Sequence, residues 1–419
     1  MNIVILSRGK FPGFDGPYRR TKLFGAGFAK NGCEVTLIVA YPPEWKKCDQ
    51  EFFDKNRFRY YHTLKADLDN KSNLIKNIFY KIIGTFKVIP LFKKIMGGKK
   101  VDVLFIYGLG FLELFVALIL KIKYKVKIVI DKTDINYQFY KYEKYSLWSM
   151  IVNLSFHEFL SGLNIALGEF FIKQHVDIVF TVSSYLKEKY TGKVKGIVRM
   201  INPALIESEA YNKTADLLNI SSDHSSYKLL SVCVNEAYFY GLFPFIEALG
   251  NLKNRYKFRL YILGSERKDY LKILNGKLIE HGLHDISTIL YKISDEEVIS
   301  LYKNVDVLLM PQANPKLAKG GFPSKISEYL ISGKPIIATL FSDLGEYLQD
   351  WKNCLIVRYG DIDSYENALC QLFDSKEFCK KLGEEARKTC LEYFDYIKGT
   401  KKIIADMQEV LLKASVKSR

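Results

Sequence analysis

The sequence predicts an α/β protein built from two Rossmann-like domains in tandem, and three observations support this prediction. The 419-residue chain is 48% hydrophobic, which is enough for two domains with ordinary cores. Short apolar runs alternate with helical stretches in both halves, as is typical of parallel strands buried on both faces. A polar, serine-rich stretch over residues 212–227 separates the halves and is predicted to be the linker.

The first half opens with the strand-like run NIVILS, residues 2–7, then a glycine-containing loop and a helix near residues 18–30. The loop, RGKFPGFDG, lacks the G-x-G-x-x-G dinucleotide fingerprint. Gly13 and Gly16 can let a ligand approach the backbone closely, although turn geometry alone also explains them. Further strands are expected over residues 34–40, 101–108, 126–134, 176–183 and 198–202.

The second half starts a new alternation of strands and helices after the linker. Its strands are expected over residues 228–235, 258–264, 287–293, 305–311, 335–339 and 353–360. We expect the domains to span residues 1–211 and 228–390, with a C-terminal helix over 391–419 that packs back on the first domain.

Composition limits the classes of partner. A formal charge of +16 and a pI near 9.2 indicate an anionic partner, and no nucleic-acid-binding module is recognisable. The seven cysteines are scattered without C-x-x-C pairs, so we expect neither a disulfide framework nor a metal site. The opening residues indicate a strand and not a signal peptide, and no apolar run is long enough to span a membrane. A cytoplasmic protein is expected.

The segment GGFPSKISEYLISGKPIIAT, residues 320–339, indicates a loop, a short helix, a turn and a strand, with Gly333 and Pro335 as the stop signal of the helix. Lys325 stands in the first turn of this helix, where free N–H groups and the helix dipole favour a phosphate. Glu328, one turn further on the same face, can accept hydrogen bonds from a ribose diol. The alternative is an ordinary solvated Lys/Glu pair on a helix surface.

This segment, with its neighbours, resembles the GT-B glycosyltransferases, and within them the retaining family commonly called family 4. The similar stretches are SDEEVISLYKNVDVLLMP (294–311), the segment 320–339 as an FPSK…EYL variant, NCLIVRYGDIDSYENAL (353–369), HVDIVFTVSSYLKEKY (175–190) and INP (201–203). The likeness covers most of the chain, is strongest over residues 290–369 and is loose before residue 107.

The resemblance implies a GT-B fold, with two Rossmann-like domains facing each other across a cleft and C-terminal helices packing back along both. It implies a nucleotide-sugar donor, of UDP or GDP type, held by the second domain, and a glycan or lipid-linked acceptor held by the first. Glu328 falls on the glutamate that binds the donor ribose, and Lys325 lies near the diphosphate. The other donor-side candidates are Lys319, Gly320, Gly321, Phe322, Ser324, Asn235 and Glu236. Asn235 and Glu236, like Arg8, are expected at strand ends that face the cleft.

Two departures from the family pattern concern the diphosphate and the sugar. The family's second glutamate, eight residues before Glu328, is replaced by Gly320. The arginine and lysine pair that often grips the diphosphate is replaced by VNEAYFYGLF, residues 234–243, which has no basic residue. Phosphate binding is therefore expected to rest on Lys325, on Lys316 or Lys319, and on helix dipoles.

In the first domain, IDKTDI ends a strand where relatives often carry a histidine or an aspartate. Asp134 is the candidate catalytic residue there, together with Lys325 on the donor side. Asp131, Gly13 and Gly16 are the acceptor-side candidates. A strand-end aspartate that simply caps the next helix is the alternative interpretation.

The resemblance implies sugar transfer with retention and without a metal or cofactor, in the synthesis of a surface polysaccharide or glycoconjugate. A catalytically degenerate binding or partner subunit is the main alternative; a sugar-nucleotide epimerase is a weaker one, and no carboxylate pair suited to a hydrolase can be assigned.

Residues 73–100 mix bulky apolar residues with lysines, which indicates either peripheral contact with an anionic membrane or an ordinary amphipathic helix. Pro90 predicts that this stretch forms at least two pieces.

Overall fold

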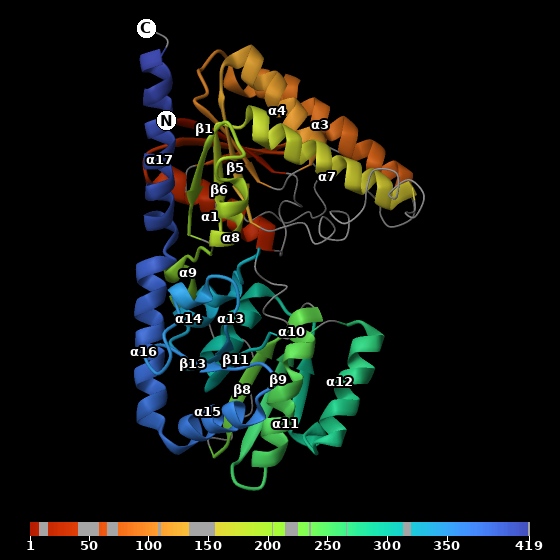
Figure 1. Ribbon diagram of the computed structural model, residues 1–419, viewed down its shortest axis with the longest axis vertical. Coiled ribbons are helices and arrows are strands. Elements are labelled where there is room, and N and C mark those ends of the chain that lie inside the picture. Colours follow the sequence, from red (N-terminus) through yellow and green to blue (C-terminus); the bar gives the residue numbers. More distant parts are fainter. Residues whose placement is uncertain are drawn as a thin grey trace. The chain divides into compact units, whose positions relative to one another are not determined.

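The computed structural model describes residues 1–7, 16–40, 58–64, 74–107, 110–133, 156–202, 204–213, 225–233, 236–264, 266–312 and 320–417 (Figure 1). The chain forms two compact units. Unit 1 comprises Met1–Leu205 and Tyr396–Arg419, and unit 2 comprises Ile206–Asp395. The boundary thus falls at Leu205, before the expected residue 211, and most of the expected linker lies outside the described residues.

Unit 1 is built around a parallel sheet. Its strands are β1 (Asn2–Ser7), β2 (Glu34–Val39), β3 (Arg59–His62), β4 (Val103–Tyr107), β5 (Lys127–Lys132), β6 (Ile178–Thr181) and β7 (Ile197–Met200). Its helices are α1 (Gly16–Lys30), α3 (Leu74–Met96), α4 (Phe111–Tyr124), α7 (Phe156–His175), α8 (Ser184–Tyr190) and α17 (Tyr396–Lys417). In the described part, the strand order is β3-β2-β1-β4-β5-β6-β7, with every pairing parallel.

The apolar runs predicted as strands in this half are all strands in the structure. The edge strand β3 was not predicted, because its sequence RYYH is polar and none of its residues is buried. Gly16, expected in a loop, is the first residue of α1. The prediction that Pro90 divides its segment was wrong: α3 is one helix that runs through Pro90, whose side chain is exposed.

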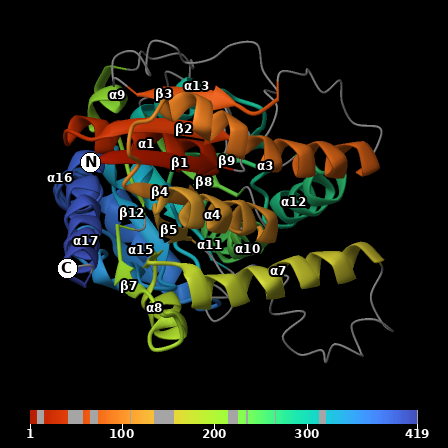
Figure 2. The same ribbon diagram turned by 90° about the horizontal axis from the view of Figure 1, so that it is seen from above.

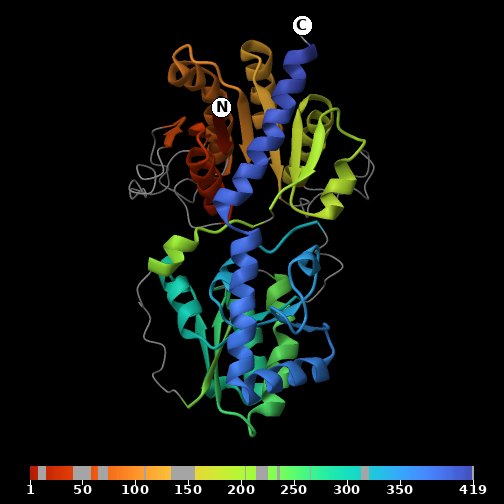
Figure 3. The same ribbon diagram turned by 90° about the vertical axis from the view of Figure 1, so that its left-hand side faces the viewer.

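Helices cover both faces of the unit 1 sheet. The helices α3, α4 and α7 lie on one face, with α4 between the other two (Figure 2). On the other face α1 packs against α17, which returns from the C-terminal end of the chain (Figure 3). The Asn31 amide fixes this packing because it donates hydrogen bonds to the Ile397 carbonyl, at 3.0 Å, and to Thr400 Oγ1, at 3.1 Å.

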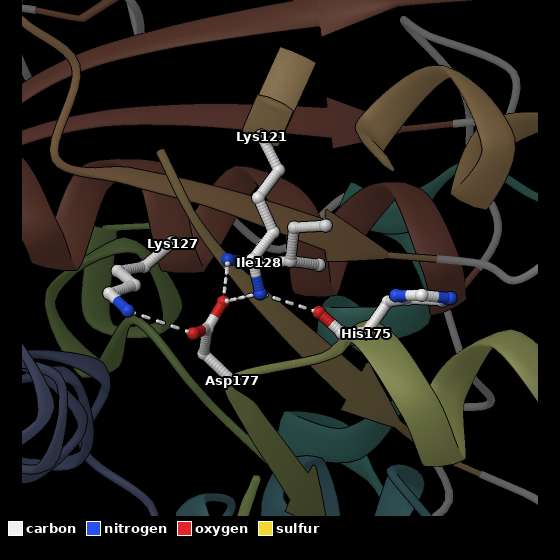
Figure 4. Close-up of polar contacts among 5 residues, drawn as sticks. All are labelled: Lys121, Lys127, Ile128, His175 and Asp177. Carbon is white, nitrogen blue, oxygen red and sulfur yellow. Dashed lines mark hydrogen bonds and ion pairs between the residues drawn. The ribbon is translucent and has the colours of Figure 1, made fainter. Parts of the chain in front are cut away.

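At the amino end of β6, Asp177 joins three parts of unit 1 (Figure 4). Its Oδ2 accepts from the Ile128 N–H at 2.9 Å and from Lys121 Nζ at 2.7 Å, and its Oδ1 accepts from Lys127 Nζ at 3.1 Å. Lys121 Nζ also donates to the His175 carbonyl at 2.7 Å, so the end of α4 is tied to the end of α7. This cluster lies opposite the carboxyl ends of the strands.

Unit 2 contains a second parallel sheet. Its strands are β8 (Tyr227–Val232), β9 (Phe258–Leu263), β10 (Ser287–Leu290), β11 (Val307–Met310), β12 (Ile336–Thr339) and β13 (Leu355–Val357). Its α-helices are α9 (Ser208–Lys213), α10 (Glu236–Gly241), α11 (Phe243–Leu252), α12 (Lys268–Glu280), α13 (Asp295–Asn304), α14 (Lys325–Ile331), α15 (Ile362–Asp374) and α16 (Lys376–Tyr393), and its 3₁₀ turns are His284–Ile286 and Leu344–Glu346. The order of the described strands is β10-β9-β8-β11-β12-β13.

The helix α14 is short and owes its position to α16. Gly333, in the turn after α14, has a φ of +69° that favours glycine, as the predicted helix stop requires. Gly383 of α16 packs directly on the carbonyl of Gly333, and Arg387 Nη1 donates to the Ile331 carbonyl at 2.6 Å. Cys390 Sγ donates to the Ser327 carbonyl at 3.3 Å. The helix of the predicted motif is therefore anchored along its length.

No helix in the described part of the chain is long and apolar enough to cross a membrane.

Gly383→Ala is expected to lower the free energy of unfolding by about 1–3 kcal/mol, because a methyl group there overlaps the Gly333 carbonyl and α14 and α16 must move apart. Gly276→Ala in α12 is the matched control, since a Cβ at this exposed position meets nothing within 4 Å. The control should leave stability unchanged or raise it by up to ~1 kcal/mol. Urea denaturation followed by circular dichroism makes the comparison, and equal midpoints for Gly383→Ala and the wild type would contradict the packing described.

Candidate functional site

Unit 2 has a small pocket at the point where its strand order reverses. The two central strands, β8 and β11, are adjacent in the sheet, but the strand that follows β8 in sequence, β9, lies on one side of this pair and the strand that follows β11, β12, lies on the other. Such a switch point leaves a crevice at the carboxyl ends of the strands, where ligands of open α/β sheets bind. The described residues that line the pocket are Val232, Tyr238, Met310, Pro311, Lys325 and Tyr329.

A buried tyrosine closes the floor of this crevice. The last paired residues of β8 and β11 are Ser231 and Leu309, beyond which the two strands no longer share hydrogen bonds. The Tyr329 hydroxyl accepts from the Val232 N–H at 3.2 Å and donates to the Leu309 carbonyl at 3.4 Å. Burial raises the pKa of Tyr329 well above its ordinary value, so the phenol stays protonated and keeps both bonds.

Lys325 supplies the positive charge of the pocket. Of the described residues that line it, Lys325 alone is charged. Burial raises the pKa of the neighbouring Cys233 thiol to about 12, against the opposing effects of the Ser231 hydrogen bond and the Lys325 charge. Burial also raises the pKa of Tyr238, which stays a neutral phenol. The described lining therefore offers one cation and the neutral Tyr238 phenol, and it contains no carboxylate, which suits a phosphate better than a metal ion.

Glu328 lies one turn after Lys325 and is oriented by a neighbouring helix. The Tyr302 hydroxyl of α13 donates to Glu328 Oε2 at 3.0 Å. Tyr302 is fully buried, and its ring meets the Tyr329 ring edge-on with centroids 5.4 Å apart. A carboxylate held in this way keeps a defined direction.

The position of α13 itself follows from local sequence. Ser294 and Glu297 form a capping box at its start, with reciprocal hydrogen bonds of 3.2 and 2.6 Å. This fixes the beginning of the helix that carries Tyr302.

The remaining donor-side candidates have different surroundings. Ser324 is the exposed N-cap of α14 and makes no side-chain capping bond, while its carbonyl accepts from Ser327 Oγ at 3.0 Å. Gly320 is buried, and the space beside the Gly321 Cα is open. The Phe322 ring packs on Tyr347, with centroids 5.5 Å apart. Glu236, expected at a strand end, is the first residue of α10.

Several predicted residues lie outside the described part of the chain. They are Arg8, Gly13, Asp134, Asn235, Lys316 and Lys319.

Asp131 is the acceptor-side candidate whose surroundings are described, and it is engaged within unit 1. Its Oδ2 and Oδ1 accept from Arg20 Nε at 2.6 Å and Nη2 at 3.1 Å. Both side chains are buried, and Arg20 also donates to the Asn202 carbonyl at 3.4 Å. The next residue, Lys132, pairs with Glu169 at 3.1 Å, and Glu169 also accepts from the Tyr190 hydroxyl at 2.8 Å. In this arrangement Asp131 positions α1 and β5.

Sequence reasoning missed the tyrosines of the site. Tyr329 directly follows Glu328, and Tyr302 stands within a recognised stretch, but neither position reveals a partner in sequence. Gln312, just beyond β11, was also missed; it is 4% exposed, and its Oε1 has no hydrogen-bond partner where the structure is described. Among the described side chains, no group of three or more His, Cys, Asp or Glu residues could hold a metal ion.

Comparison with known proteins bears on the same segment. Residues 221–389 match the family described as glycosyl transferases group 1. An uncharacterized glycosyltransferase of Methanocaldococcus jannaschii is 23% identical over 247 residues, which are 58% of this chain and 64% of that protein. The chain thus spans less than two thirds of the length of this curated relative.

Solved structures share the whole fold. Sucrose-phosphate synthase of Thermosynechococcus elongatus matches 98% of this chain and 99% of its own, with a TM-score of 0.69 and 15% identity. Anabaena HepE in complex with UDP-glucose matches 98% of this chain and 100% of its own, with a TM-score of 0.65 and 13% identity. The fold is GT-B, with two Rossmann-like units, and residues 221–389 match the model of the glycosyl transferases group 1 family.

Proposed function

We propose that this protein is a glycosyltransferase that moves a sugar from a nucleoside-diphosphate sugar to a glycan or lipid-linked acceptor. The observation that carries the proposal is the pocket at the β8–β11 switch point, where Lys325 is the charged lining residue and Glu328 follows one turn later. This pocket falls within the segment that matches a glycosyl transferase family. Anabaena HepE, which has the same fold, was crystallised in complex with UDP-glucose, and this makes UDP the first nucleotide to test.

In the proposed reaction the bond between the sugar C1 and the diphosphate oxygen breaks, and an acceptor hydroxyl oxygen bonds to C1. The acceptor proton passes to the departing phosphate, on the same face, so the configuration is retained; this stereochemistry rests on the family 4 resemblance alone. The protein must stabilise the charge that develops on the diphosphate. Lys325 does this with its ammonium group and Tyr238 with a neutral hydrogen bond, without a metal ion. Glu328, oriented by Tyr302, binds the ribose.

The competing function is nucleotide binding without transfer, as in a degenerate partner subunit. It is favoured by the single charge among the described pocket residues, since a diphosphate leaving group carries at least two negative charges. Incubation with a UDP-sugar separates the two functions: release of sugar or transfer to an acceptor supports the enzyme, whereas binding with no turnover supports the partner subunit.

We expect a nucleoside diphosphate to raise the melting temperature of the protein in EDTA, in a panel of UDP, GDP, ADP, CMP, dTDP and NAD. At a ligand concentration of 100 times the Kd, the protein is stabilised by about 2.7 kcal/mol.

Lys325→Gln should weaken UDP binding by about 1.5–3 kcal/mol, the range for a charged hydrogen bond, and leave uridine binding unchanged. Lys380→Gln, an exposed substitution on α16, is the control. No shift with any nucleotide, or equal losses for UDP and uridine, would contradict the phosphate assignment.

The ribose assignment makes a separate prediction. Wild-type protein should bind UDP more tightly than 2′-deoxy-UDP, and Glu328→Ala should lose about 1–3 kcal/mol of UDP affinity together with this preference. Tyr302→Phe keeps the buried ring but removes the hydroxyl that orients Glu328, so it should reduce the preference by a smaller amount, about 0.5–1.5 kcal/mol. Titration calorimetry gives the affinities, and thermal unfolding checks stability. If Glu328→Ala changes the stability of the protein but still binds UDP more tightly than 2′-deoxy-UDP, the assignment of Glu328 to the ribose is refuted.

A further inference from the structure

The outer helices of unit 1 expose large apolar side chains toward solvent. The α3–α4–α7 surface consists of Ile82 and Phe86 on α3, Phe115 and Ile122 on α4, and Leu163 and Phe170 on α7. Each of these side chains is at least 36% exposed, and Ile122 is 73% exposed. Single exposed apolar residues are common, but groups on adjacent elements mark interaction sites.

Ring contacts make this surface continuous across the three helices. Phe86 lies 6.4 Å from Phe115 between ring centroids, which joins α3 to α4. Phe115 contacts Phe111 at 6.1 Å, Phe111 contacts Phe171 of α7 at 5.2 Å, and Phe171 contacts Phe170 at 6.1 Å. These five phenylalanines therefore form one aromatic band across the three helices. The helix α4 lies between α3 and α7 (Figure 2).

Basic residues border the same surface. Each of the three helices connects two parallel strands of one sheet, so the helices run in the same direction and their last turns lie at the same edge. Those last turns carry Lys93 and Lys94 on α3, Lys123 on α4 and Lys173 on α7.

The described acidic side chains of α3, α4 and α7 are buried or paired within unit 1, and they do not lie on the exposed surface. Glu113 of α4 is 4% exposed, and Glu169 of α7 pairs with Lys132. The charge presented beside the aromatic band is therefore positive.

We infer that the α3–α4–α7 surface binds an anionic phospholipid bilayer, with the aromatic band at the headgroup and acyl boundary and the lysines against lipid phosphates. Apolar residues bordered by lysines suit this interface, and no described helix spans a membrane, so the contact is peripheral. A second copy of the chain fits less well, because two such surfaces would bring like-charged edges together in a molecule of charge +16. The inference does not depend on the proposed transfer activity.

The test is co-sedimentation of the full chain with vesicles of phosphatidylcholine alone or with phosphatidylglycerol, in the absence of nucleotide and acceptor. Wild-type protein should bind the anionic vesicles and lose binding as salt rises. Ile122→Glu should lower the partition coefficient about 10-fold or more, because it places a negative charge on the α3–α4–α7 surface at its most exposed apolar residue. Ile279→Glu on α12 of unit 2 is the matched control, since Ile279 is 64% exposed, and it should bind as the wild type does.

The charge contribution is measured with a second pair of variants. The double variant Lys93→Glu/Lys94→Glu should lower binding to anionic vesicles about 5-fold or more for each lysine. The control double variant on α12, Lys268→Glu/Lys272→Glu, should have a small effect on this binding. Absence of wild-type binding, or equal losses in the test and control variants, would overturn the inference. So would self-association that Ile122→Glu abolishes without any vesicle binding, which would assign the surface to a second copy. The proposed donor site is tested independently, by the stabilisation of the protein on nucleotide binding, so failure of membrane binding does not affect that proposal.

Discussion

The candidate site depends on the separation of two parallel strands. Ser231 and Leu309 are the last paired residues of β8 and β11. Beyond them the backbone N–H and C=O groups of the two strands need other hydrogen-bond partners. The buried Tyr329 hydroxyl supplies two of these partners at once, through the Val232 N–H and the Leu309 carbonyl. An unsatisfied buried backbone group costs about 1–3 kcal/mol, so this phenol offsets the loss of strand pairing where the crevice begins.

The same helix that carries Tyr329 also carries Lys325 and Glu328, so one short element combines a structural group with the two groups proposed to bind the donor. A helix of two turns has little stability of its own, and its position must come from tertiary packing. Gly383, Arg387 and Cys390 of α16 hold it from one side, and Tyr302 of α13 holds the Glu328 carboxylate from another. Preorganised charge of this kind is what stabilisation of a leaving phosphate requires.

Local patterns in the sequence predicted much of the fold, and distant contacts account for what they missed. The apolar runs predicted the strands, and Gly333 predicted the end of α14, because burial and a positive φ leave local signals. Tyr302 contacts Glu328 26 residues away, and Arg20 contacts Asp131 111 residues away. Neither pair leaves a periodic or local signal. Pro90 misled because a proline inside a helix can kink it without ending it, and the local sequence does not distinguish the two outcomes.

The most direct test of the account is a crystal structure of the protein with the nucleoside diphosphate that stabilises it. We predict that the phosphates lie in the pocket between Val232, Tyr238 and Lys325, with the ribose hydroxyls against the Glu328 carboxylate and Tyr302 behind it. A nucleotide bound elsewhere in unit 2, or bound here with its phosphates away from Lys325, would contradict the proposed role of α14.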